Sequence, residues 1–253
     1  MLQDWTFWAA AAPAVILFGL SKSGFSGLGA LGIPIMSLSI PPVQAAAITL
    51  PILVVQDWVG VYAFRREVDK RNLAILMPAA GLGVVLAWAM AAEVNEDVVR
   101  LAVGLVAVGF VAITLVREHL LAAGRPTRAD IAPGLFWGAV SGFASFVSHA
   151  GGPPFLVYAA PQKMDAKLFA GTSVLFFAAV NLMKLPPYLL LGQFTRANLT
   201  ASLALLPLAI VSTLAGVWVV RRVPVSKFYN IVLAVTGGLG LKLIYDAARA
   251  LVG

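Results

Sequence analysis

Long apolar runs separated by short charged loops form the main pattern of the chain. The runs cover about 7–40, 43–64, 73–92, 98–116, 131–160, 168–191, 199–220 and 228–248. A helix needs about 20 apolar residues to cross the hydrocarbon core of a bilayer, and most runs have that length. The alternating ten-residue segments of a transmembrane barrel are not seen. We therefore expect an all-α integral membrane protein.

Two of the runs, 7–40 and 131–160, are too long for one span and too short for two. Each contains a stretch rich in Gly, Ser and Pro, "SKSGFSGLGALGIP" at 21–34 and "SGFASFVSHAGGPP" at 141–154. Gly and Pro interrupt a helix, and the freed backbone is tolerated at membrane depth only inside protein or beside a wet cavity. We read each run as two half-helices that meet at a broken tip within the stretch.

The two halves of the sequence resemble each other. "SGFSGLGALGIP" from Ser23 matches the stretch from Ser141, and Asp57 in "VVQDWVG" parallels Asn181 in "AAVNLMK". This internal duplication predicts a single transport domain over residues 1–253, made of repeat one (1–124) and repeat two (125–253). Each repeat contains one broken element and three transmembrane helices.

The basic loop residues distinguish two topologies. If both broken elements span the membrane, the repeats are parallel and nine basic loop residues lie inside against six outside. If both are re-entrant hairpins, the repeats are inverted and the split is twelve to three, with only Arg100, Arg196 and Arg249 outside. The second split agrees better with the excess of Lys and Arg in cytoplasmic loops. We therefore expect inverted repeats with both chain ends outside.

Composition supports a membrane protein and argues against several functions. The 253 residues are 60% hydrophobic and 11% charged, whereas soluble domains have about 25% charged residues. The net charge of +7 comes from the loops, so it does not indicate nucleic-acid binding. There is no Cys, and no HExxH, GxSxG or phosphate-loop motif is present. We expect no enzyme activity, no cofactor and no metal site.

Polar residues inside the apolar runs are the candidates for a site. Inverted repeats bring two broken tips together near the midplane, where such transporters bind their substrates. Buried ammonium groups are costly and usually mark a pathway, so Lys22 and Lys184 indicate an anion, although a lysine near a helix end can also extend to the interface. The expected substrate-binding residues are Lys22, Ser23, Gly24, Phe25, Ser26, Gln56, Ser141, Gly142, Phe143, Ser145, Ser148, His149, Gly151, Gly152, Asn181 and Lys184.

Asp57 and His149 are the candidates for coupling, with the proton as the coupling ion. Asp57 is the one acid deep in an apolar run, and histidine titrates near neutral pH. Each has a structural alternative. Asp57 is equally suited to be a permanent counter-ion of Lys22 or Lys184, because buried charges tend to pair, and a lone histidine is often a packing residue.

The motifs "GFSGLGALGIP" and "GFASFVSHAGGPP", with the doubled apolar pattern, resemble those of the TauE/SafE sulfite exporter family, also called the toluene sulfonate uptake permease family. The similarity covers nearly the whole chain. It implies a multi-pass secondary carrier in the bacterial inner membrane for sulfite, sulfoacetate or other organosulfonates, working by alternating access. Two features depart from the usual pattern: Lys22 stands where an uncharged residue is more common, and the first motif has fewer consecutive glycines.

The expected partners are a small anion, the lipid bilayer and a second copy of the chain. Three alternatives stay open at this point. The chain could be an anion channel, a carrier of another small organic solute with Asp57 as the ligand, or a membrane-embedded assembly partner without transport. The identity of the anion and the direction of transport also stay open.

Overall fold

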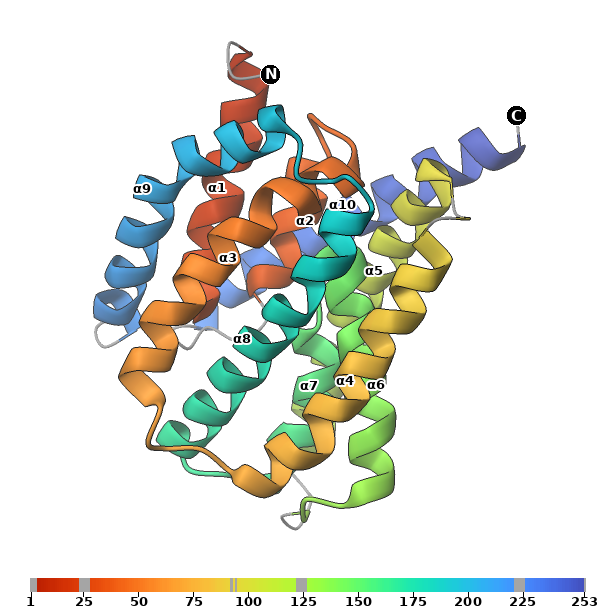
Figure 1. The fold of residues 1–253 in the computed structure, drawn as a ribbon. Coiled ribbons are helices and arrows are strands. Elements are labelled where there is room, and N and C mark those ends of the chain that lie inside the picture. The colour runs from red at the N-terminus through yellow and green to blue at the C-terminus, as the bar shows by residue number, and fades with distance from the viewer. Residues whose placement is uncertain are drawn as a thin grey trace.

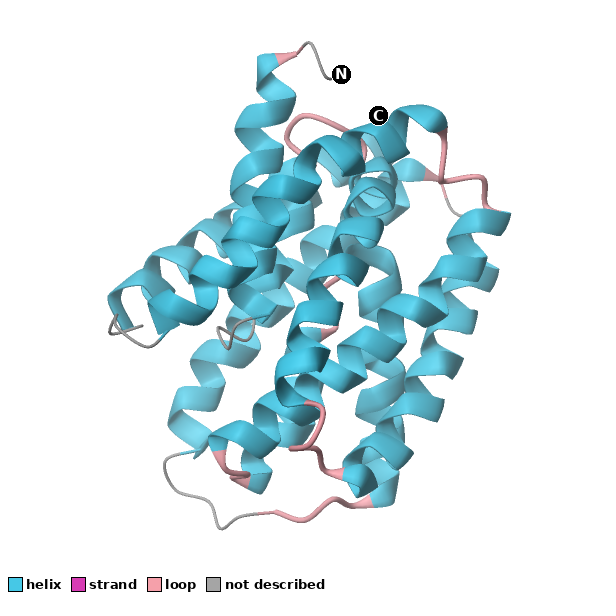
Figure 2. Ribbon diagram, turned by 60° about the vertical axis from the view of Figure 1, so that its left-hand side comes forward, coloured by secondary structure: helices cyan, strands magenta, loops and turns pink. Residues whose placement is uncertain are grey.

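The computed structural model describes residues 4–22, 28–91, 93, 95–121, 127–220 and 226–252, and every regular element among them is a helix (Figures 1 and 2). The elements are α1 (Trp5–Lys22), η1 (Leu28–Leu31), α2 (Gly32–Met36), α3 (Pro42–Phe64), α4 (Lys70–Ala91), α5 (Glu96–Leu121), α6 (Ile131–Ser148), α7 (Gly152–Ala159), η2 (Ala160–Gln162), α8 (Ala166–Leu190), α9 (Arg196–Val220) and α10 (Ser226–Val252). The all-α prediction is confirmed for this part of the chain.

Six helices in the described part of the chain, α1, α3, α4, α6, α8 and α9, are long and apolar enough to cross a membrane. The outer surface of α4 shows what surrounds them. Leu82, Leu86 and Met90 follow one another at every fourth residue, and each is at least half exposed. Such an apolar stripe suits lipid and would be unfavourable in water. The prediction of a multi-pass membrane protein is therefore confirmed.

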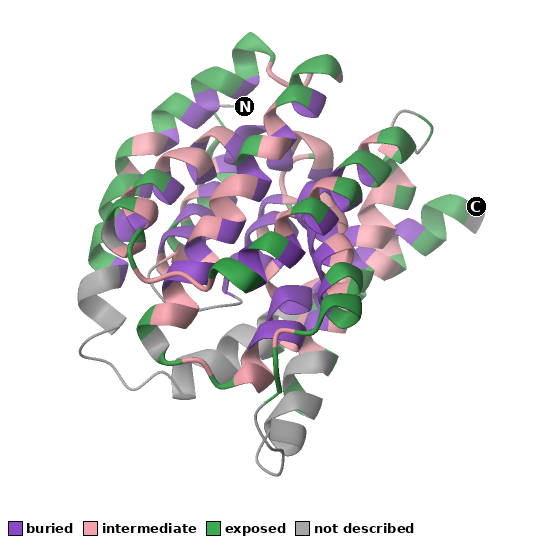
Figure 3. Cartoon of the chain, turned by 60° about the horizontal axis from the view of Figure 1, so that its bottom comes forward, coloured by how far each residue is buried: buried purple, intermediate pink, exposed green. Residues whose placement is uncertain are grey.

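The helices run between two ends of the bundle (Figure 1). Both chain ends lie at the upper end in that view, where α1, α3 and α9 begin, while α4, α6 and α8 begin at the lower end. Buried residues lie along the surfaces that the helices turn toward one another, and exposed residues lie on the outside (Figure 3). The buried core therefore runs through the middle of the bundle.

Hydrogen bonds join the loops at the lower end, which comprises segments 65–69, 127–130 and 160–165. Arg71 Nε donates to the Ala129 carbonyl at 3.0 Å, Asn72 Nδ2 donates to Gln162 Oε1 at 2.8 Å, and the Thr127 N–H donates to the Pro161 carbonyl at 3.0 Å. At the upper end, Gln44 Nε2 donates to Asn198 Oδ1 at 3.0 Å. Segments far apart in the sequence therefore meet at each end.

The break in the second element lies within the stretch 141–154 and is short. Helix α6 continues to Ser148, so Ser141, Gly142 and Phe143 are helical, and the break is confined to residues 149–151. A Cβ atom at Gly142 would overlap the backbone of Ala80, so this glycine allows α6 to pack closely against α4.

His149 ends α6 in a left-handed conformation. Its φ is 53° and its N–H donates to the Ser145 carbonyl at 3.0 Å, which satisfies one of the last carbonyls of the helix. The chain then turns into α7, which begins at Gly152. In the first broken element, residues 23–27 lie outside the described part of the chain, and η1 and α2 follow them.

Candidate functional site

Lys22, Asp57 and Asn181 form one connected polar cluster in the middle of the bundle. Lys22 is the last residue of α1, and its Nζ forms an ion pair with Asp57 Oδ1 on α3. Asn181 Nδ2 on α8 donates to the other oxygen, Asp57 Oδ2, at 2.5 Å. Asp57 is only 3% exposed, so its charge is balanced by neighbours and not by water. The cluster ties together α1, α3 and α8.

Lys184 is the centre of a second cluster. It lies on α8 three residues after Asn181 and therefore on the same helix face, and it is fully buried. Its Nζ lies 3.1 Å from the Ser145 carbonyl, 3.1 Å from Ser145 Oγ and 2.7 Å from His149 Nδ1. These three acceptors match the three N–H groups of an ammonium. Lys184 therefore joins α8 to the end of α6.

His149 is hydrogen-bonded through both ring nitrogens. Nε2 lies 3.0 Å from the Ala46 carbonyl, which can only accept a hydrogen bond, so Nε2 carries a proton. Nδ1 lies 2.7 Å from Lys184 Nζ and 3.2 Å from the Ser145 carbonyl. With Lys184 as an ammonium, Nδ1 accepts from it, the imidazole is neutral, and the His149–Lys184 pair carries one positive charge.

A small cavity of about 70 Å³ lies beside both clusters. Five of the residues expected to bind substrate line it, namely Lys22, Ser145, His149, Gly152 and Asn181. Ligand pockets for drug-sized molecules measure about 300–1,000 Å³, so this cavity suits a ligand of few atoms. Its lining combines charged and polar donors with aromatic and aliphatic side chains.

Other residues that were expected to bind substrate do not line the small cavity and form hydrogen bonds to the backbone. Ser141 Oγ donates to the Gly151 carbonyl at 2.7 Å and holds the chain after the break against α6. Ser148 Oγ donates to the Ala144 carbonyl at 3.3 Å, within its own helix. Gln56 Nε2 donates to the Ala209 carbonyl of α9 at 3.3 Å, and Gln56 Oε1 is buried without a hydrogen-bond partner among the described residues.

Gly142 and Phe143 pack away from the small cavity. Gly142 contacts α4, as described above, and Phe143 packs against the core and lines a second cavity. Ser23, Gly24, Phe25 and Ser26 lie outside the described residues.

Several cavity residues were missed by the sequence interpretation. Ser173 and Phe177 line the cavity from α8, eight and four residues before Asn181, and therefore share its helix face. That spacing is the signal that could have found them. Lys22 Nζ lies 5.8 Å from the centre of the Phe177 ring, within the range of a cation–π contact. Ser21 also lines the cavity, next to Lys22.

A larger cavity of about 340 Å³ lies on the other side of His149. Ala46, Phe146 and Tyr188 line it, and it extends to Glu96 and Gln193 near the upper-end loops. Tyr188 OH donates to the Phe146 carbonyl at 2.8 Å, and its ring stacks with His149 at a centroid distance of 6.4 Å. We call His149, Ala46, Phe146 and Tyr188 the central layer, because His149 lines the small cavity and contacts Ala46 and Tyr188, which line the larger one together with Phe146.

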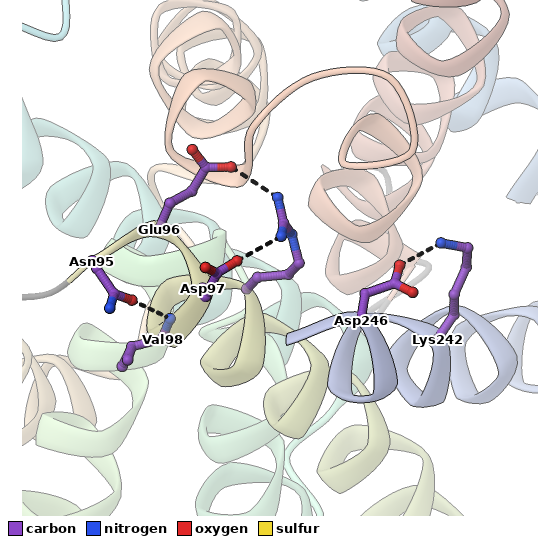
Figure 4. A network of polar contacts seen from close by, with 7 residues as sticks. Asn95, Glu96, Asp97, Val98, Lys242 and Asp246 are labelled. Atoms are coloured by element: carbon purple, nitrogen blue, oxygen red, sulfur yellow. Dashed lines mark hydrogen bonds and ion pairs between the residues drawn. The ribbon is translucent and has the colours of Figure 1, made fainter. Parts of the chain in front are cut away.

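The other ion pairs of the described residues join partly exposed side chains on α5 and α10 (Figure 4). Arg100 contacts Glu96 at 2.8 Å and Asp97 at 2.7 Å in the first turns of α5, and Lys242 contacts Asp246 at 2.5 Å on α10. Exposed pairs of this kind contribute about 0–1 kcal/mol to stability. In the described part of the chain, no group of three or more His, Cys, Asp or Glu side chains could hold a metal.

Comparison with known proteins gives one match. The family described as "Sulfite exporter TauE/SafE" matches residues 11–243, which is nearly the whole chain. No curated protein and no solved structure matches the chain.

Proposed function

The chain belongs to the sulfite exporter TauE/SafE family, and from this premise we propose that it is a secondary transporter of small sulfur-containing anions. Sulfite, sulfoacetate and other organosulfonates are the proposed substrates. The proposed location is the inner membrane of a bacterium, with a single transport domain built from repeats 1–124 and 125–253, in a homodimer.

One observation carries the proposal for an anion. Lys184 is fully buried and bound only to neutral groups among the described residues, and it lies next to a cavity that Lys22 also lines. A buried positive charge without an acidic partner is unfavourable, and an anion in the cavity would relieve that cost. Asn181, Ser145 and Ser173 add neutral hydrogen-bond donors around the same space.

The arrangement of helices supports inverted repeats. Helices α1, α3 and α9 begin at the upper end, whereas α4, α6 and α8 begin at the lower end (Figure 1). Each element of the first repeat therefore runs opposite to its counterpart in the second: α1 to α6, α3 to α8, and α4 to α9. The two broken elements enter from opposite ends and meet at the cavity, as re-entrant hairpins in inverted-repeat carriers do.

The two cavities support alternating access. The small cavity extends along α8 to Ser173, toward the lower end, and the larger cavity extends toward the upper end. The central layer lies between them and would close the path on the upper side. In this proposal, rearrangement of the central layer opens the small cavity to the larger one while the lower side closes.

The proton is the proposed coupling ion, and Asp57 and His149 are the proposed coupling residues. Asp57 is bound by Lys22 and Asn181, and its ion pair with Lys22 opposes protonation, so release of Lys22 would favour uptake of a proton. His149 must lose the Lys184 contact to accept one at Nδ1. Arrival of an anion at the lysines would release either partner, which links anion binding to proton uptake.

Purified protein reconstituted into liposomes tests the proposal. We expect saturable flux of sulfite and methanesulfonate, reduced in Lys184→Met and unchanged in the control Lys242→Met, whose lysine is exposed. Ohmic anion currents would indicate a channel. Flux of a neutral or cationic solute without anion flux would indicate the solute carrier with Asp57 as ligand. Absence of any flux with intact folded protein would contradict the transporter proposal.

A further inference from the structure

We propose that the site is electrically balanced for one monovalent anion, and that a divalent anion binds only together with one proton. The inference rests on the proposed function and specifies the charge class of its substrates. It follows from the charges that meet at the small cavity and from the hydrogen bonds that assign them.

The ionisable groups beside the cavity carry a net charge of one. Lys22 and Asp57 form an ion pair and cancel each other. We assign Lys184 as an ammonium because three acceptors surround its Nζ, and His149 as neutral with its proton on Nε2, so the pair carries a single positive charge. Asp57 and Lys184 are the only buried charged residues in the described part of the chain.

No other group beside the cavity changes this sum. The remaining polar side chains facing it, Ser21, Ser145, Ser173 and Asn181, are neutral. On the upper side, the Tyr188 hydroxyl donates to the Phe146 carbonyl and is therefore neutral. Residues 23–27, which lie outside the described part, read Ser-Gly-Phe-Ser-Gly and contain no ionisable side chain.

A net charge enclosed in an apolar surrounding is unfavourable, and neutralising it is favourable. One monovalent anion brings the sum at the cavity to zero without any proton. One divalent anion brings it to minus one, and one proton from solution restores it to zero. Asp57 is placed to take that proton: Lys22 turns toward the anion, and the carboxylate becomes a carboxylic acid that still contacts Asn181.

Methanesulfonate and sulfate are suitable probes because both are small and tetrahedral and neither titrates near neutral pH. The experiment is calorimetric titration of the full-length protein in buffers with different ionisation enthalpies, which counts the protons taken up on binding. We expect no proton with methanesulfonate and one with sulfate. By linkage, the affinity for sulfate then falls about tenfold for each pH unit of rise while that for methanesulfonate stays constant.

A variant sharpens the test. Asp57→Asn removes one negative charge, so the net charge of the groups beside the cavity becomes plus two. We expect sulfate to bind to this variant without a proton and with an affinity independent of pH. The matched control is Asp246→Asn, which removes an exposed carboxylate that pairs with Lys242, and should leave both proton counts unchanged. The proton counts of the unmodified protein decide the matter even where Asp57→Asn does not fold.

The outcomes separate this inference from the function on which it rests. Sulfate binding without a proton, or methanesulfonate binding with one, overturns the inference while leaving anion transport intact. If methanesulfonate binds but sulfate does not bind at any pH, the inference that a divalent anion binds together with one proton is overturned. If neither anion binds to folded protein, the proposed function itself fails, and this inference fails with it.

Discussion

Asn181 donates a hydrogen bond of 2.5 Å to Asp57, and these two residues are aligned with each other in the proposed repeats. The contact joins α3 to α8, which run in opposite directions through the bundle (Figure 1). A pair of equivalent positions in inverted repeats meets directly only near the axis that relates the repeats. In the proposed repeats, an acid in the first repeat is aligned with an amide in the second, so only one of the two aligned positions carries a charge.

Removing the charge of Lys184 tests the anion site. Lys184→Met retains most of the side-chain volume and removes the contacts to Ser145 and His149. Loss of a charge-assisted hydrogen bond costs about 1.5–3 kcal/mol, so we expect methanesulfonate affinity to fall about 10–150-fold. Calorimetric titration of purified protein measures this. Lys242→Met serves as the control, and unchanged affinity in both Lys184→Met and Lys22→Met would mean that the lysines are structural.

Two glycines of the second broken element should respond in opposite ways to alanine. A Cβ at Gly142 would overlap the backbone of Ala80, whereas a Cβ at Gly152 meets nothing within 4 Å and points into open space at the cavity. We expect Gly142→Ala to lower the free energy of unfolding by about 1–3 kcal/mol, the usual cost of overpacking. Gly152→Ala should have the same free energy of unfolding as the unmodified protein.

Gly142→Ala and Gly152→Ala should also differ in their effect on anion binding. The methyl group of Gly152→Ala would occupy part of a space of about 70 Å³, so we expect anion affinity to fall severalfold. Thermal unfolding in detergent and anion titration, made on the same samples, separate the two effects. Equal destabilisation by both variants would contradict the assignment of Gly152 to the cavity.

Single cysteines can distinguish inverted from parallel repeats, because the chain has no cysteine of its own. Glu93 and Thr127 are exposed positions in two connections, and Lys167 and Arg196 are exposed positions in the first turns of α8 and α9, next to two others. Inverted repeats expose Thr127 and Lys167 on the inside and Glu93 and Arg196 on the outside. An impermeant thiol reagent added to intact cells should therefore label only the last two. Labelling of Lys167→Cys together with Glu93→Cys would restore the parallel arrangement.

The charged members of the site could be predicted from the sequence because a charge inside an apolar run is a strong signal. Lys22, Asp57, His149 and Lys184 all lie at or beside the cavity, and the structure pairs Asp57 with Lys22, one of the two lysines considered as its counter-ion. Which lysine would pair could not be predicted, because that depends on how α1 and α8 approach α3. Sequence spacing within one helix does not contain this information.

The apolar members of the site could not be predicted in the same way. Phe177 lines the cavity, but an aromatic residue in an apolar run looks the same whether it faces lipid, core or a ligand. Gly142 shows the related difficulty with glycine. In a membrane helix, a glycine can mark a break or a close helix contact, and only the position of Ala80 on α4 decides between them.

The last prediction concerns the coupling of transport to protons through Asp57. If Asp57 takes up the proton that accompanies a divalent anion, its carboxylate must exchange partners during each transport cycle. Asp57→Asn removes the carboxyl group with little change of shape, and asparagine is the residue at the position that the proposed repeats align with Asp57, namely Asn181. We expect the variant to bind sulfate, but its sulfate flux into liposomes should no longer respond to an imposed pH difference. Asp246→Asn is the control, since its carboxylate is exposed on α10 and should leave the response unchanged. A variant at position 57 that retains the full stimulation would show that Asp57 is a permanent counter-ion of Lys22, and His149 would then be the remaining proton acceptor at the cavity.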